Sequence, residues 1–167
     1  MNVFKKYIIR VFNRLQNLSQ QQKYLEFRSK YTIHKTFKFN GTGIEMYGNG
    51  EITIGKNTYI GQFTFLQSSK NQKISIGENC AISHNVKIYT NSYDSNPNFN
   101  VINKKTHQGN VIIGDGVWIG VNVVIIPGIT IGNNVIIGAN SVVTKDVNKN
   151  TIVGGVPAKI IRIKDDK

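Results

Sequence analysis

The sequence has very little cysteine and no long apolar run, and both absences restrict where the protein works. Cys80 is the only cysteine among 167 residues, which excludes an internal disulfide and suits a reducing compartment. No apolar run approaches the roughly 20 residues that a membrane-spanning helix needs. The N-terminus does not resemble a signal peptide, because Lys5, Lys6, Arg10 and Arg14 interrupt its apolar residues. We therefore expect a cytoplasmic protein.

Acidic residues are also scarce. There are 9 Asp and Glu against 21 Lys and Arg, so the net charge is +12. Such a balance indicates an anionic partner, which could be nucleic acid, acidic lipid or a phosphorylated small molecule. A recognition-helix pattern, zinc-ligand spacing and the aromatic signature of RNA-binding domains are all missing, so nucleic acid is not predicted. Only three histidines occur, without paired spacing, and no catalytic metal is expected.

Residues 2–18 have the pattern of an amphipathic helix. Their apolar residues fall on one helical face, whereas the four basic residues fall elsewhere. Such a face could pack on the rest of the protein or on a neighbouring subunit. Alternatively, the basic helix could rest on a membrane surface. Residues 19–43 are more polar and are expected to form a linker or a second short helix, followed by a turn.

The remaining sequence has a period of six. Neither a helix, which repeats at about 3.6 residues, nor a strand, which repeats at 2, explains this period alone. Glycine often follows the repeating aliphatic residue. The members of the register are Ile54, Ile60 and Leu66, then Ile76, Ile82 and Ile88, and then Ile113, Ile119, Ile125, Ile131, Ile137 and Val143.

This spacing predicts a three-sided coil. A strand of two or three residues would point its aliphatic side chain inward and end in a tight corner, where glycine or asparagine tolerates positive φ. Three such edges make a coil of about 18 residues, and coils stack at the roughly 4.8 Å spacing of paired strands. Because no single coil buries its apolar face alone, several must stack. The prediction is an all-β protein, a parallel β-helix of hexapeptide repeats with Cys80 as core filler.

Two segments interrupt the period. The shorter, "QSSKNQK", delays it between Leu66 and Ile76. The longer covers about residues 89–112, and loops of this length in a compact repeat protein usually carry function. We expect this excursion loop to leave the coil and cover a site.

The repeat ends near Asn148. The tail is expected to form a closing strand and a short capping helix that starts near Pro157, because proline suits the first helical position. The expected organisation is therefore an N-terminal helix and linker at residues 1–43 and a β-helix domain at residues 44–163.

The stretch "VWIGVNVVIIPGITIGNNVIIGANSVVTKDV", followed by "TIVGGVPAKIIR", resembles the hexapeptide-repeat acyltransferases. The similarity is greatest to the maltose, galactoside and surface-polysaccharide acetyltransferases, and it covers roughly residues 50–163. The resemblance implies a left-handed β-helix, a homotrimer with active sites between subunits, and acetyl-CoA as co-substrate.

The resemblance also implies roles for individual residues. Trp118 and Gly120 of "VWIG" would lie by the pantetheine arm or the acceptor. The CoA groove would be lined by Ala139, Thr144 and Lys145, and its phosphates would meet Lys159 and Arg162. Cationic side chains suit phosphate groups.

The catalytic base is less evident. In the family a histidine at the start of the large loop takes the acceptor's proton, but here Tyr93 occupies that position. A tyrosine with its ordinary pKa near 10 is a poor base. The remaining candidates are His84 and His107, with His34 taken as structural, and we place His84 first because a rigid coil positions it better. An amine acceptor could instead lose its proton to Asp94, and Asn85 or a backbone amide could stabilise the oxyanion.

The resemblance, with which the basic net charge agrees, implies an acetyl-CoA-dependent acetyltransferase. Its acceptor would be a sugar hydroxyl or amino group, in surface-polysaccharide or nucleotide-sugar biosynthesis. The same scaffold could instead acetylate a xenobiotic or an amino acid, or act as a non-catalytic scaffold.

Overall fold

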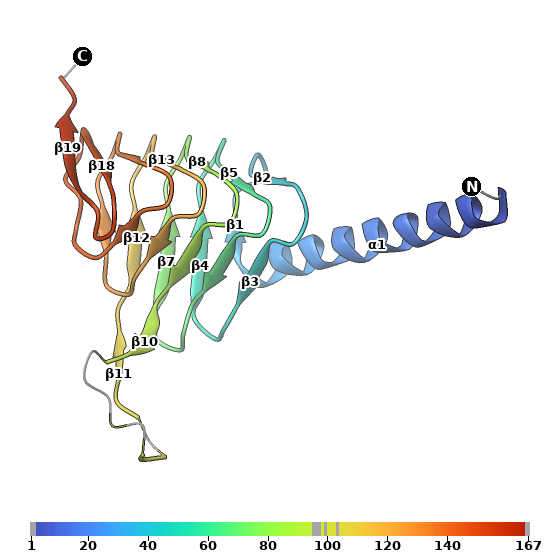
Figure 1. Ribbon diagram of the computed structural model, residues 1–167, viewed down its shortest axis with the longest axis horizontal. Helices are drawn as coiled ribbons and strands as arrows, with labels where there is room; N and C mark the ends of the chain where they lie inside the picture. Colours follow the sequence, from blue (N-terminus) through green and yellow to red (C-terminus); the bar gives the residue numbers. More distant parts are fainter. Residues whose placement is uncertain (1–2, 95–97, 99, 103, 166–167) are drawn as a thin grey trace. The chain divides into compact units, whose positions relative to one another are not determined.

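The computed structural model describes residues 3–94, 98, 100–102 and 104–165, and the chain divides into two compact units, Met1–Tyr31 and Thr32–Lys167. The first unit is one helix, α1 (Val3–Lys30) (Figure 1). The predicted N-terminal helix is confirmed but is longer than expected, since it continues without a break into the segment expected to form a linker or a second short helix. Residues 3–30 contain no glycine or proline, and Gln, Lys, Leu and Glu favour helix in its second half. In the part of the chain that the structure describes, no helix combines the length and apolarity that crossing a membrane requires.

The second unit is a left-handed parallel β-helix of about five turns with three sheet faces (Figure 1). The first face contains β1 (Thr32–Ile33), β4 (Glu51–Ile54), β7 (Lys73–Ile76), β12 (Val111–Ile113) and β15 (Thr130–Ile131). The second face contains β2 (Lys38–Asn40), β5 (Tyr59–Gly61), β8 (Ala81–Ile82), β13 (Trp118–Ile119), β16 (Ile136–Ile137), β18 (Thr151–Gly154) and β19 (Lys159–Ile163). The third face contains β3 (Glu45–Tyr47), β6 (Phe65–Gln67), β9 (Lys87–Tyr89), β14 (Val124–Ile125) and β17 (Val142–Val143).

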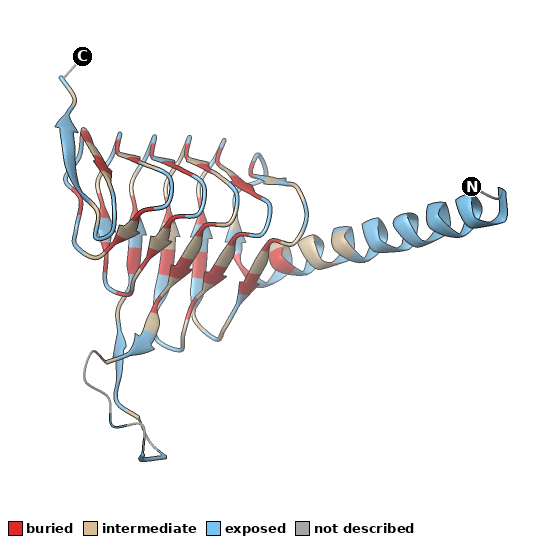
Figure 2. Ribbon diagram, in the orientation of Figure 1, coloured by how far each residue is buried: buried red, intermediate tan, exposed pale blue. Residues whose placement is uncertain are grey.

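The sixfold register forms the core of this prism. Each of its twelve aliphatic side chains is at most 2% exposed (Figure 2). Successive turns place them above one another, so that Ile82 pairs with Ile60 on one side and with Ile119 on the other. Two strands of the first turn, β1 and β2, lie within residues 19–43, for which the sequence predicts a linker or a second short helix and then a turn. Cys80 is also buried, as predicted, and its thiol donates to Gly114 O at 3.1 Å.

Asparagines at the corners provide the sharp turns. Asn85, Asn122 and Asn140 occupy one corner in successive turns, with φ of 56°, 60° and 57°. Asn85 Nδ2 donates to Asn122 Oδ1 at 2.9 Å, and Asn122 Nδ2 donates to Asn140 Oδ1 at 2.8 Å. Asparagine tolerates this left-handed conformation, and the side-chain ladder binds one turn to the next.

The predicted excursion loop leaves the coil as an antiparallel hairpin of β10 (Asn91–Tyr93) and β11 (Thr106–Gln108) (Figure 1). Residues 95–97, 99 and 103 of this loop lie outside the described part of the chain. The base of the hairpin is tied to the coil, because Gly109 N donates to Thr90 O at 3.0 Å.

The prediction of a capping helix near Pro157 is wrong. Residues 155–158 form a turn that pairs with β17: Val142 N donates to Gly155 O at 3.0 Å, and Ala158 N donates to Val142 O at 2.8 Å. The chain then reverses into β19, which pairs antiparallel with β18. Proline suits a turn as well as a helix start, and the β-branched residues Ile160, Ile161 and Ile163 favour a strand.

Candidate functional site

The predicted site residues form two groups at different corners of the prism. The second corner, between the second and third faces, carries or adjoins His84, Asn85, Trp118, Gly120 and Ala139. The third corner, between the third and first faces, carries Tyr93, Asp94, His107, Thr144 and Lys145. Each side of the coil is about six residues long, so the two corners of one chain lie roughly 15–20 Å apart. One chain therefore does not bring the two groups together.

His84 projects from the rigid second corner, but one of its nitrogens is already occupied. The backbone N–H of Gln62, one turn below, donates to His84 Nδ1 at 3.0 Å. With its lone pair at Nδ1 engaged, the neutral ring carries its proton on Nε2. In this tautomer the exposed nitrogen is a hydrogen-bond donor, which suits binding of an oxygen atom rather than removal of a proton.

Asn85 is held within the corner ladder. Its Nδ2 donates to Asn122, and its Oδ1 accepts a hydrogen bond from Lys87 Nζ at 2.9 Å. These contacts show that the Asn85 side chain stabilises the corner of the coil, independently of any role in catalysis.

The other members of this group differ in exposure. Trp118 is 53% exposed, and on the second face its neighbours in register are Ala81 and Ile136. Gly120 is buried, and a β-carbon built on it would lie 2.6 Å from Ala139 N of the next turn. Gly120 thus permits the close stacking of the turns, while Trp118 presents an exposed aromatic surface.

The hairpin at the third corner carries three candidate side chains. Tyr93 is 57% exposed on β10, and Asp94 forms an ion pair with Lys105 at 3.3 Å. His107 pairs with Ser92 across the hairpin. A β-carbon built on Gly128, in the coil, would lie 3.6 Å from His107 Nε2, so the imidazole lies against the coil at this glycine.

The next turn above Gly128 carries Thr144 and Lys145. This stacking is direct, because Thr130 N donates to Asp146 Oδ1 at 2.7 Å and Val147 N donates to Thr130 O at 2.9 Å. His107 and Lys145 therefore lie at the same third corner, within roughly two turns of each other along the coil, whose turns are about 4.8 Å apart.

A groove of about 320 Å³ adjoins this edge at the C-terminal end of the coil. Lys145 and Lys159 both line it, together with the apolar side chains of Val143 and Val153 and with Asp146, whose carboxylate already accepts the hydrogen bond from Thr130 N. Two cations beside an apolar floor suit a phosphorylated ligand with an apolar portion. Arg162 lies further along β19, opposite Ile152, and is not among the lining residues.

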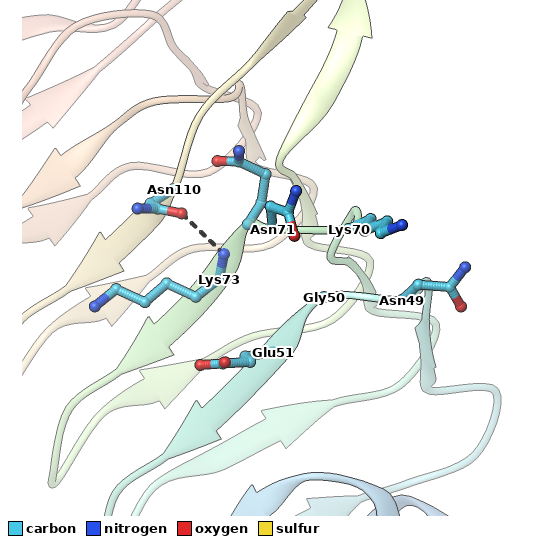
Figure 3. Close-up of a pocket in the computed structure, with 8 residues that line it drawn as sticks. Asn49, Gly50, Glu51, Lys70, Asn71, Lys73 and Asn110 are labelled. Carbon is cyan, nitrogen blue, oxygen red and sulfur yellow. Dashed lines mark hydrogen bonds between the residues drawn. The ribbon is translucent and has the colours of Figure 1, made fainter.

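A second groove, of about 530 Å³, lies on the same corner toward the other end of the coil (Figure 3). Amide side chains at Asn49, Asn71 and Asn110 line it, and Asn110 Oδ1 accepts a hydrogen bond from Lys73 N at 2.9 Å. The side chains of Lys70 and Lys73 point away from one another, so their charges do not converge (Figure 3). Sequence reasoning missed this groove, although the delay at "QSSKNQK" marks its position.

This geometry defines a hexapeptide-repeat protein. The sequence profile described as "Bacterial transferase hexapeptide (six repeats)" matches residues 110–145. The chain is 33% identical to a hexapeptide-repeat acetyltransferase of Vibrio cholerae whose crystal structure contains acetyl coenzyme A. That similarity covers 74% of this chain and 72% of the other, with a TM-score of 0.51. The chain belongs to the hexapeptide-repeat acyltransferase family.

Two curated relatives come from Escherichia coli K12. The chain is 30% identical to a putative lipopolysaccharide biosynthesis O-acetyl transferase over 130 residues, which is 73% of this chain and 65% of that protein. It is 40% identical to galactoside O-acetyltransferase over 123 residues, which is 72% of this chain and 58% of that protein. The chain thus spans about three fifths of the length of these relatives.

Proposed function

We propose that the protein is an acetyl-CoA-dependent acetyltransferase that acetylates a sugar hydroxyl or amino group in surface-polysaccharide or nucleotide-sugar biosynthesis. The observation that carries this proposal is the third corner, where His107 lies against the coil below Thr144, Lys145 and the basic groove. The similarity to two sugar-related O-acetyltransferases supports a glycan acceptor.

The CoA moiety would lie along the C-terminal part of the coil. Lys145 and Lys159 suit its phosphates, with Arg162 further along the same strand. Ala139 and Trp118 would contact the thin pantetheine arm from the second corner, where Gly120 keeps the turns close. The active site would face the cytoplasm, where the single buried thiol stays reduced.

We propose His107 as the general base, in preference to His84. His107 Nε2 would take the acceptor's proton while the acceptor oxygen attacks the thioester carbonyl. The tetrahedral oxyanion would then collapse with cleavage of the carbon–sulfur bond, and the imidazolium would return the proton to the departing thiolate. The Nε2–H of His84 suits stabilisation of the oxyanion, alongside a coil amide. Tyr93 and Asp94 on the hairpin would contact the acceptor.

Because the two groups of residues lie at different corners, we propose that the working protein is a homotrimer. The third corner of one subunit would meet the second corner of its neighbour, and each active site would be shared. The exposed side chains of Trp118 and Val121, which are 53% and 42% exposed, support a partner at the second corner. The basic helix α1 would be its contact with the membrane surface.

The direct test is release of CoA thiol, measured with a thiol reagent, in the presence of amino sugars, nucleotide sugars and polysaccharide repeat units. Cys80 is buried and should contribute little background. The variant H107Q should lower kcat by about 10²–10⁴-fold. H84Q should retain more activity than H107Q. A larger loss in H84Q than in H107Q would contradict the assignment of His107 as the general base. Failure of the protein to bind acetyl-CoA would refute the proposed function.

The shared site is tested by mixing lesions from the two corners. H107Q and W118A should each be weakly active alone. In trimers assembled from equal amounts of both, about a quarter of the sites would combine an intact His107 with an intact Trp118 from a neighbour. Recovery to about a quarter of wild-type activity is expected. No recovery would mean either that His107 and Trp118 of the same subunit act in one site or that the two side chains do not act together, and either result would contradict the shared site.

A further inference from the structure

Helix α1 has two halves with different surroundings. Between Tyr7 and Leu18 its apolar side chains are all exposed, by 41–65% (Figure 2). Toward the other end, Phe27 and Tyr31 are only 7% exposed, and their rings are 6.5 Å apart. At 100° per residue, Phe27 lies about 160° around the helix from Val11. The buried aromatic side chains and the exposed apolar face are therefore on opposite sides of one continuous helix.

The exposed face is broad and continuous. We call it the N-terminal apolar face. Ile8, Val11 and Leu15 form its centre, and the larger rings of Tyr7 and Phe12 widen it. Helices of soluble proteins normally bury such a face, so a second surface must cover it in the working protein.

Charge indicates what that surface is. Lys5 lies about 120° from Val11 on one side of the helix, and Arg10 and Arg14 lie about 100° and 60° away on the other. Long basic side chains in these positions can hold their charges at lipid headgroups while the face between them enters the bilayer. No acidic residue occurs before Glu26.

A second copy of the helix is the competing occupant. Ile8, Val11, Leu15 and Leu18 have the three- and four-residue spacing of a coiled-coil seam. However, residues 3–25 offer no carboxylate to pair with Lys5, Lys6, Arg10 and Arg14, so parallel copies would bring like charges together. The same cations are favourable at an anionic bilayer, where each contributes about a fivefold gain in binding.

We infer that the N-terminal apolar face of α1 binds anionic lipid bilayers in the plane of the membrane surface. The segment that binds is the first half of the helix, from Val3 to Leu18. This inference develops the membrane contact proposed above, and it would place the enzyme where lipid-linked or surface glycans are assembled.

The test uses the full-length protein and two kinds of vesicle, phosphatidylcholine alone and phosphatidylcholine with about one third phosphatidylglycerol. Wild-type protein should sediment with the anionic vesicles and much less with the neutral ones. Binding should weaken in high salt, which screens the headgroup charge. The double variant K5Q/R10Q should bind the anionic vesicles about 25-fold more weakly.

A matched pair of variants separates insertion from charge. I8E and Q16E each add one negative charge to the same helix, but only Ile8 lies on the N-terminal apolar face. I8E should lose at least tenfold more binding than Q16E, since it removes the burial of an aliphatic side chain. Equal losses, or no binding of the wild type to either vesicle, would overturn the inference.

The competing occupant has its own signature. If copies of α1 bind one another, I8E would lower the molar mass in solution without vesicles, and the inference would be wrong. Vesicle binding requires neither acetyl-CoA nor acceptor. A failure here would leave the proposed acetyl transfer intact, and an inactive enzyme that binds vesicles would leave this inference intact.

Discussion

Replacing Gly114 by alanine should separate two turns of the coil. A β-carbon at this first-corner position would lie 2.9 Å from Asn133 N and 3.0 Å from Gly132 C, and it would also collide with Asn133 Oδ1. Carbon atoms pack at about 3.5–4.0 Å, so the turns would have to move apart by up to about 1 Å. Two hydrogen bonds resist this: Gly114 N to Ile131 O at 2.8 Å, and Asp115 N to Asn133 Oδ1 at 2.9 Å.

The expected cost follows from these contacts. Overpacking a close-packed site costs about 1–3 kcal/mol, and weakening two hydrogen bonds adds about 1 kcal/mol. We expect G114A to lower the free energy of unfolding by about 3 kcal/mol. Gly116 is the matched control, because it has φ of +64° but no atom within 4 Å of its β-carbon position. G116A should cost only about 0.5–1 kcal/mol, since left-handed strain is partly offset by reduced entropy of the unfolded chain.

Urea unfolding followed by far-UV circular dichroism measures both variants, at one protein concentration because the proposed association would contribute to the free energy of unfolding. The loss in G114A reports the spacing of the turns, because Gly114 has no left-handed φ, whereas the loss in G116A reports backbone strain without crowding. If G114A costs no more than G116A, the close stacking of turns at Gly114 does not limit the size of the side chain there, and the reasoning fails.

Three other results are expected. Burial raises the pKa of the Cys80 thiol and shields it, so a maleimide should label Cys80 only after unfolding. The free energy of unfolding should fall as the pH rises past the thiol's ordinary pKa of 9.0, because the thiol ionises in the unfolded chain before it ionises in the folded one. N122A should lower the free energy of unfolding by about 2 kcal/mol, because it strains the backbone at φ +60° and breaks two hydrogen bonds of the asparagine ladder. N122G should lower it less, because glycine accepts this φ, and equal losses would assign the whole cost to the ladder. K145Q/K159Q should raise the KM for acetyl-CoA about tenfold with little change in the free energy of unfolding. K149Q removes a charge at the first corner and should leave KM unchanged, and an equal effect of both would indicate only general electrostatic attraction.

Most of the coil could be predicted from the sequence because its rule is local. A residue such as Ile82 points inward for the same reason as Ile60 and Ile119, and each short edge repeats the pattern of the one before it. The excursion at Tyr89 was visible because a strict period makes any break obvious. The sequence leaves linker and helix open after Leu18, because "SQQQK" is polar but contains no helix breaker.

The errors and gaps arise where the partner is distant in the chain. Near Pro157 the local signals conflict, because proline suits the first turn of a helix while the isoleucines that follow favour a strand, and only the pairing of β19 with β18 decides between them. The tautomer of His84 depends on the amide of Gln62, 22 residues away. Likewise, the position of His107 against Gly128 follows from the path of the hairpin and has no signal in its own neighbourhood.

The geometry of a three-sided coil also explains why a site built on it would be shared. Exposed side chains such as His84 and Lys145 project from different corners, and buried aliphatic side chains fill the interior between them, so one cannot reach the other through the prism. Along a corner, each turn of the coil presents its side chains and backbone amides about 4.8 Å from those of the next turn. This spacing suits an extended ligand, but one chain can contact that ligand from one side only. An acyl carrier and its acceptor need groups from both sides, as well as exclusion of water. In the proposed trimer a neighbouring subunit would supply the second side without any change in the coil, and a change in the hairpin at the third corner alone would adapt the site to a new acceptor.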